Sequence, residues 1–188
     1  MKTLWILVPI AIVAGVTTWK LKKVPEKSAD WRLSPHFFAS EFMQTETSLP
    51  APVFERNSQP AIGLSRLCLN ILEPLRAALE TNYPGEFESV IITSGYRYPE
   101  LNLEIGGSLS SQHQCLRKGE AAADVVVPNI SPVNVIQSCF REGLPVDQAI
   151  EEFGRWAHLS VPPLGKAPRR QYLVASKGPN GTEYHPLS

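Results

Sequence analysis

Two histidines and one aspartate have the residue types and positions of a metal site. His113 and His158 lie in or beside segments with the pattern of β-strands, and Asp124 heads the apolar run of another. Two imidazoles and one carboxylate can supply three ligands to zinc and leave a fourth position for water, as in catalytic zinc sites. A strand histidine is also a common hydrogen-bonded core or surface residue, and the chain has no H-E-x-x-H motif. The spacing alone leaves both interpretations open.

The segment Ser94–His113, "SGYRYPELNLEIGGSLSSQH", places an arginine, two adjacent glycines and a histidine directly after the apolar run "SVIIT". A strand that leads into a polar loop often supports functional groups on that loop. We therefore expect Arg97 and His113 to face one cleft. The glycine pair Gly106 and Gly107 is more typical of turns than of substrate contacts.

Helices and strands must position these residues. Apolar residues from Ile62 to Leu79 recur at the i, i+3, i+4, i+7 spacing of one helix face, which predicts a core helix. Pro74 lacks the amide that a helix interior needs, so we expect a kink or a break there. A second helix is predicted after Ser131 as its N-cap, with Pro132 in its first turn and Gly143 past its end. Apolar or aromatic runs predict strands at 90–93, 121–127, 155–161 and 169–176.

Composition narrows the class of protein. The 188 residues fit one domain with a sizeable core, and the formal net charge is zero. No basic run interleaved with aromatic residues is present, so a nucleic-acid surface is not predicted. The three cysteines, Cys68, Cys115 and Cys139, lack C-x-x-C spacing, which argues against a disulfide framework or a cysteine zinc site. None of these features indicates an oligomeric state.

The chain divides into four predicted parts. Residues 1–23 contain Lys2, an apolar stretch from Leu4 to about Trp19 and three further lysines, a pattern between a secretory signal and a minimal membrane span. No A-x-A site follows, which favours an uncleaved anchor, while lysines on both flanks leave its orientation undecided. Residues 24–32 form a linker, 33–176 the domain and 177–188 an exposed tail. We therefore expect an exported or membrane-anchored protein.

Four motifs occur in the order of a known family: "SGYRYPELN", "GGSLSSQH", "GEAAAD" and "EFGRWAHLSV". They resemble the zinc D-Ala-D-Ala carboxypeptidase and L-alanyl-D-glutamate peptidase family, M15, especially its phage and prophage members. The similarity runs from about Leu33 to Ala175 and includes "LSPHFFASEF", "ILEPLR" and "RRQYLVAS". It implies an α+β fold of the hedgehog and DD-peptidase type, with a small, mostly antiparallel sheet and helices packed on one side.

The resemblance also implies roles for individual residues. It implies that Zn²⁺ is bound by His113, Asp124 and His158. These are the three residues that residue type and position also indicate. The guanidinium of Arg97 would stabilise the negative charge on the peptide carbonyl oxygen, unless it only forms an ion pair that shapes the loop.

Two polar neighbours complete the expected substrate side of the site. Ser94 and Gln112 are expected as hydrogen-bonding groups that bind substrate or support the ligands.

Two departures from the family pattern bear on the site. The family usually reads S-x-H-x-x-G-x-A-x-D, whereas here the longer segment Gln114–Ala123 separates His113 from Asp124. "GEAAAD" also carries an extra alanine, which would turn Asp124 to the other face of its strand unless a bulge or a longer loop compensates. Cys115, inside the longer segment, is an alternative ligand.

The second departure concerns the general base. Many members have an acidic residue where this chain has Arg155, and Glu152 is the natural substitute, with Glu151 as the fallback. An extended chain would place Glu152 roughly 20 Å from His158, so it reaches the site only if the chain turns at Gly154. Otherwise either glutamate is simply a solvated helix end.

These residues predict zinc-dependent hydrolysis of peptidoglycan stem-peptide bonds, with Glu152 moving the proton of the attacking water and Arg97 stabilising the oxyanion. The alternative is a non-catalytic, membrane-tethered protein on the same fold that binds cell wall, or a structural or lysis-associated phage protein. Metal content separates the enzyme from the first alternative.

Overall fold

The computed structural model describes residues 5–13, 16–23, 30–179 and 181–187, and the chain forms two compact units, Met1–Asp30 and Trp31–Ser188. In the first unit, β1 (Trp5–Val13) pairs antiparallel with β2 (Val16–Lys23). No helix in the described part of the chain is long and apolar enough to cross a membrane. Residues 24–29 of the predicted linker lie outside the described residues, and the signal or anchor stays a prediction.

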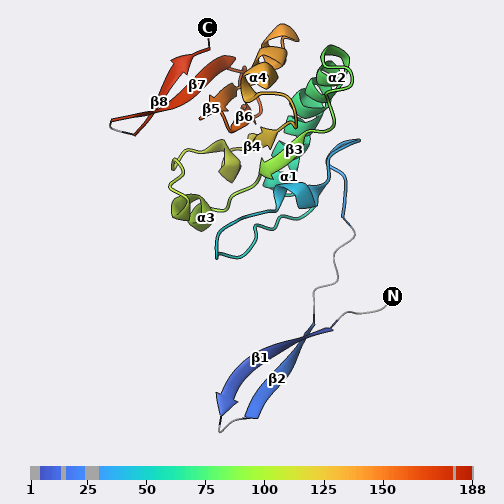
Figure 1. Cartoon of the computed structure of the whole chain (residues 1–188), viewed down its shortest axis with the longest axis vertical. Helices are drawn as coiled ribbons and strands as arrows, with labels where there is room; N and C mark the ends of the chain where they lie inside the picture. The colour runs from blue at the N-terminus through green and yellow to red at the C-terminus, as the bar shows by residue number, and fades with distance from the viewer. Residues whose placement is uncertain (1–4, 14–15, 24–29, 180, 188) are drawn as a thin grey trace. The chain divides into compact units, whose positions relative to one another are not determined.

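The second unit is built on a six-stranded sheet with the order β3-β4-β6-β5-β7-β8 (Figure 1). All neighbouring strands are antiparallel except β5 and β7, which are parallel. The strands are β3 (Ile91–Ser94), β4 (Ala121–Val126), β5 (Gln148–Glu152), β6 (Trp156–Val161), β7 (Gln171–Gly178) and β8 (Gly181–Pro186). This arrangement confirms the predicted α+β fold with a mostly antiparallel sheet.

Three helices cover one face of this sheet. The first, α1 (Gln59–Leu67), contacts β4 and β6, α4 (Pro132–Arg141) contacts β5 and β6, and α2 (Glu73–Asn82) packs on α4. Ser131 caps α4 by accepting a hydrogen bond from the Asn134 amide at 3.3 Å, as the sequence predicts. The short α3 (Pro99–Glu104) lies in the loop between β3 and β4, apart from these helices.

The predicted core helix is interrupted close to Pro74. A π-helical turn, Cys68–Leu72, joins α1 to α2, and Pro74 sits in the first turn of α2. A wider turn suits this position because proline offers no amide and its ring crowds the preceding carbonyl. An irregular turn is therefore present close to Pro74, where the sequence predicts a kink or a break, and the chain stays helical through it.

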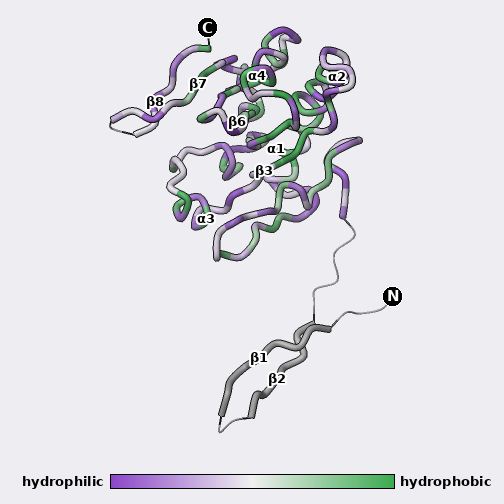
Figure 2. Tube along the Cα trace, in the orientation of Figure 1, coloured by the Kyte–Doolittle hydropathy of each residue, from purple (hydrophilic) through white to green (hydrophobic). Residues whose placement is uncertain are grey.

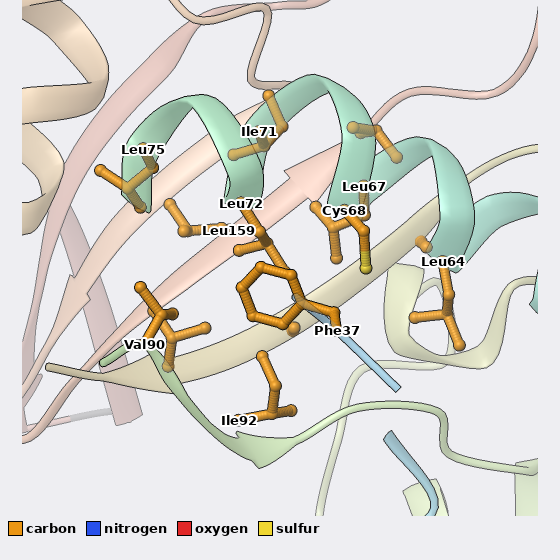
Figure 3. Packing of buried hydrophobic residues seen from close by; sticks show 14 of the residues in the cluster. Phe37, Leu64, Leu67, Cys68, Ile71, Leu72, Leu75, Val90, Ile92 and Leu159 are labelled. Atoms are coloured by element: carbon orange, nitrogen blue, oxygen red, sulfur yellow. The ribbon is translucent and has the colours of Figure 1, made fainter. Parts of the chain in front are cut away.

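The apolar stripe of these helices forms the core together with the inner face of the sheet. Figure 3 shows the helix residues Leu64, Ile71 and Leu75 in one cluster with Phe37 and the strand residue Leu159. All five side chains are buried, and this burial is the main stabilising contribution to the unit.

Two strands differ from the sequence prediction. Strand β5 was not predicted, and the segment 177–188, expected as a tail, supplies the end of β7 and all of β8. The compact unit accordingly extends to Ser188. Figure 2 shows that β8 is largely hydrophilic, and its residues are exposed, so it lacks the apolar alternation by which a strand is recognised.

Candidate metal and catalytic site

Three potential metal ligands converge on the sheet face opposite the helices. Asp124 on β4 is the direct partner of His158 on β6, so the two side chains lie on the same face. His113 reaches them from a 3₁₀ turn, Gln112–Gln114. Its Nε2 lies 3.2 Å from Asp124 Oδ1 and 3.2 Å from His158 Nδ1, and His158 Nδ1 lies 2.9 Å from the same carboxylate oxygen. The structure thus brings together the three residues that the sequence identifies.

The extra residues before Asp124 are absorbed without turning this side chain away. The register between β3 and β4 shifts at Thr93, so that Ile92 faces Val125 and Ser94 faces Asp124. The hydroxyl of Thr93 donates to the Asp124 carbonyl at 3.0 Å and closes this bulge. This bulge lies on β3, whereas β4 keeps a regular register with β6 from Ala121 to Val125. The extra residues before Asp124 are therefore accommodated in the longer loop before β4, one of the two alternatives that the sequence leaves open.

The tautomer of His113 is fixed by a backbone carbonyl. Its Nδ1 lies 2.7 Å from the carbonyl oxygen of Gly95, which can only accept a hydrogen bond. The ring proton therefore resides on Nδ1, and Nε2 presents a lone pair to Asp124 and His158. Gly95 itself must be glycine, because a Cβ there would lie 2.5 Å from the Phe42 Cα atom.

The donor set fits a divalent metal ion. The ligand atoms of His113, Asp124 and His158 all lie within 4.8 Å of one another. Burial lowers the pKa of His113, which keeps its imidazole neutral. Burial opposes ionisation of Asp124, but its electrostatic interactions and hydrogen bonds with His113 and His158 outweigh burial and hold the pKa of this carboxyl well below its usual range. Neutral imidazoles and an ionised carboxylate are the forms that bind metals.

Arg97 and Ser94 support the aspartate from the other side. Arg97 Nη2 donates to Asp124 Oδ2 at 2.5 Å, and Arg97 Nε donates to Ser94 Oγ at 2.9 Å. The Arg97 amide also donates to the His113 carbonyl at 3.0 Å. Arg97 therefore orients Asp124 so that Oδ1 faces the histidines, a contact that the sequence did not indicate. Ser94 contacts the arginine.

Gln112 has a supporting position as well. Its side chain is buried, and Nε2 donates to the Val161 carbonyl at 3.0 Å. This bond joins the 3₁₀ turn that carries His113 to the end of β6. The contact is one that a ligand-supporting residue would make, while substrate binding by Gln112 stays a prediction.

Glu152 is the last residue of β5 and reaches the site because the chain turns directly after it. Phe153 and Gly154 have φ angles of 58° and 70°, and the hairpin they form pairs Glu152 with Trp156. Glu152 is then a diagonal neighbour of His158 on the same face, a separation of about 7–8 Å. The turn that the sequence requires at Gly154 is present, and the alternative of a solvated helix end is wrong.

The environment of Glu152 suits a general base. Trp156 Nε1 donates to Glu152 Oε2 at 3.0 Å, which fixes the carboxylate. Burial raises the pKa of Glu152 above the ordinary glutamate value, and the negative charge of Asp124 adds to this, whereas His158, Trp156 and Arg97 oppose it. A raised pKa brings a carboxylate closer to the value at which it both accepts and returns a proton near neutral pH.

The fallback residues lie elsewhere. Glu151 points to the helix-covered face, is buried, and accepts a hydrogen bond from the Gly154 amide, so it holds the turn. The Cys115 thiol is buried, which raises its pKa to about 12, so a thiolate ligand is disfavoured. Arg155, which replaces the usual acidic residue, stacks on the Trp156 ring at 5.1 Å.

A cleft of about 1290 Å³ is lined by the three metal-ligand candidates and by Arg97, Gln112, Glu152 and Trp156. Strands β7 and β8 form part of its wall through Leu173 and Tyr184. Glu152 pairs with Ala175 on β7, and Ala175 pairs with Tyr184 on β8, so these side chains share one face. Sequence reasoning missed Tyr184, and no apolar pattern in the polar C-terminal segment could have revealed it.

One family comparison covers the metal-ligand candidates and the catalytic residues of this site. The sequence profile described as Peptidase M15 matches residues 35–160, from the segment before the first 3₁₀ turn to the penultimate residue of β6. No curated protein matches the chain. The matched residues include Arg97, His113, Asp124, Glu152 and His158, whose arrangement the structure shows. Because the match spans more than half of the sequence, the chain belongs to the peptidase M15 family.

Proposed function

We propose that the chain is a zinc peptidase that hydrolyses peptidoglycan stem-peptide bonds, of the D-Ala-D-Ala carboxypeptidase or L-Ala-D-Glu endopeptidase type. The single observation that carries this proposal is the convergence of His113, Asp124 and His158 in a cleft that also holds Glu152. Membership of a peptidase family supports the reaction class. A substrate outside the cytoplasmic membrane agrees with the predicted export or anchoring of the chain.

His113, Asp124 and His158 would hold the zinc ion through two nitrogens and one oxygen, the ligand types that zinc prefers. When bound, zinc supplies Lewis acidity, which polarises the scissile carbonyl and lowers the pKa of water to about 7. The protein groups around it have separate tasks.

Glu152 acts as the general base and then as the general acid. Its carboxylate accepts a proton from the attacking water and returns one to the nitrogen of the leaving amine. Trp156 occupies Oε2 through its indole N–H, so Oε1 is the oxygen available for this transfer. The raised pKa of Glu152 makes its carboxylate a stronger base for the first step.

Arg97 has two roles in this proposal. It orients Asp124 through Nη2, and its guanidinium lines the cleft, where it donates to the substrate carbonyl oxygen as negative charge develops. A planar, fixed guanidinium serves both tasks because its donors point in several directions at once.

A direct assay tests the proposed function. The full chain, loaded with zinc, is incubated with a synthetic stem peptide, and the products are identified by mass spectrometry. We expect hydrolysis at one peptide bond, and the mass of the fragments tells the carboxypeptidase from the endopeptidase type. The same assay with a chelator should show no product. Folded, zinc-loaded protein that leaves every bond intact would favour the non-catalytic, cell-wall-binding alternative.

A further inference from the structure

The cleft continues past the metal residues to a second group of side chains, Arg117, Lys166 and Arg169, here called the basic end. We propose that the basic end binds a carboxylate of the substrate that lies several residues away from the scissile bond. This inference rests on the proposed peptidase function and adds to it a specificity determinant. Lys166 and Arg169 lie beyond residue 160, outside the region that the family profile matches.

Two loops that form the basic end are tied into one rigid unit. The Arg66 guanidinium, from α1, donates to the carbonyl oxygens of both Gly119 and Pro162, the latter at 2.8 Å. The Leu164 amide also donates to the Lys118 carbonyl at 2.8 Å. The loop before β4 and the loop after β6 therefore hold fixed positions, so a ligand there meets preorganised charges.

Buried carboxylates hold the two arginines in place. Glu120 accepts from Arg117 Nε at 2.7 Å, and Asp147 accepts from Arg169 Nη2 at 2.7 Å. The Glu120 and Asp147 side chains are only 2% and 4% exposed, whereas those of Arg117 and Arg169 are 60% and 49% exposed. The negative charges thus lie beneath the surface, and the guanidinium groups remain accessible.

Lys166 adds a further positive charge. The loop carrying it also lines the cleft, and in the described part of the chain no carboxylate forms an ion pair with this lysine. The basic end therefore has three positive charges and only two buried negative charges beneath them. The excess positive charge at an accessible surface favours an anionic group, and the guanidinium N–H groups that Glu120 and Asp147 do not use can donate to a carboxylate.

The position of the basic end sets its distance from the reacting bond. Strand β6 runs from Trp156 through His158 to Val161, and Pro162 follows in the cleft wall. Asp147, which binds Arg169, donates its amide to the Ser160 carbonyl, two residues along β6 from His158. At about 3.3 Å per residue, the stretch from Ser160 to Pro162 lies roughly 7–13 Å from His158, the length of about two to four residues of an extended peptide. The recognised carboxylate is therefore remote from the bond that is cut.

Binding to the full chain without added metal tests the inference independently of catalysis. Calorimetry compares a synthetic stem peptide carrying free carboxylates with versions in which one carboxylate at a time is amidated. We expect Lys166→Gln to raise the Kd of the free peptide about 3- to 10-fold. Amidation of the remote carboxylate should raise it similarly and abolish the effect of Lys166→Gln.

Lys177→Gln is the matched control, since Lys177 is an exposed lysine that does not line the cleft, and it should bind like the parent. The inference is overturned if the parent does not bind the free peptide, if Lys166→Gln binds it as tightly as the parent, or if the loss is the same for all amidated peptides. If charge-dependent binding is found but the zinc-loaded chain cuts no bond, the inference stands as a binding site and the proposed function fails.

Discussion

Replacing Glu152 with glutamine is expected to lower turnover of a stem peptide by about 10²- to 10⁴-fold, the range that general acid–base catalysis contributes. Glutamine keeps the size of the side chain and can still accept the Trp156 hydrogen bond, but it cannot take the proton of the attacking water. Zinc content should stay at the parent value, because Glu152 is not among the converging ligands. Steady-state kinetics and elemental analysis measure both effects.

Glu151→Gln is the matched control for this change. Glu151 is the preceding residue on the opposite face, and a glutamine oxygen can still accept the Gly154 amide, so activity should stay close to that of the parent. Equal losses in the two variants would assign the effect to the hairpin and contradict the role of Glu152 as the base.

The pH dependence provides a second test of Glu152. The base must be ionised, and burial raises its pKa, so activity should rise with pH through a value above that of an ordinary glutamate. Below that value Glu152 is protonated and activity falls. The residual activity of Glu152→Gln should not show this fall in activity at low pH. If the variant lost activity at low pH as the parent does, the ionisation would belong to another group.

Arg97→Ala is expected to lower turnover about 10²-fold or more at saturating zinc, the scale for loss of one oxyanion donor. Zinc should also bind about 10- to 100-fold more weakly, because Asp124 loses the partner that orients it. Arg97→Lys should recover part of both losses, since an ammonium restores the charge but not the planar fork. Activity titrated against zinc separates the two effects.

Two outcomes would revise the account of Arg97. If Arg97→Ala had parent activity at every zinc concentration, the arginine would only shape the loop. If saturating zinc restored full turnover, Arg97 would position Asp124 without contacting the transition state.

Much of the fold follows from local patterns in the sequence. The apolar stripe of 62–79, the irregularity close to Pro74 and the capped helix after Ser131 depend on residues close together in the chain, and the structure shows all three. Strand β5, "QAIEE", was missed because it is short and ends in two glutamates. Strand β8 was missed because its residues are polar and exposed, and only pairing with β7 makes it a strand.

The sequence predicts which residues make up the site but not how those residues contact one another. His113, Asp124 and His158 are indicated by residue type and by family resemblance, and the structure brings them together. The ion pair of Arg97 with Asp124 depends on strand register and on a bulge, which no local pattern specifies. Contacts between segments distant in sequence are set by tertiary packing, so the basic end was likewise not visible in the sequence.

Titration of the metal-free full chain with zinc, followed by the rate of stem-peptide hydrolysis, tests the central claim most directly. The account predicts that the rate rises with added zinc until about one ion per chain is present and then stays constant, and that His113→Ala and His158→Ala show no such rise. A folded chain that takes up no zinc, or one that hydrolyses the peptide equally well without it, would contradict the claim.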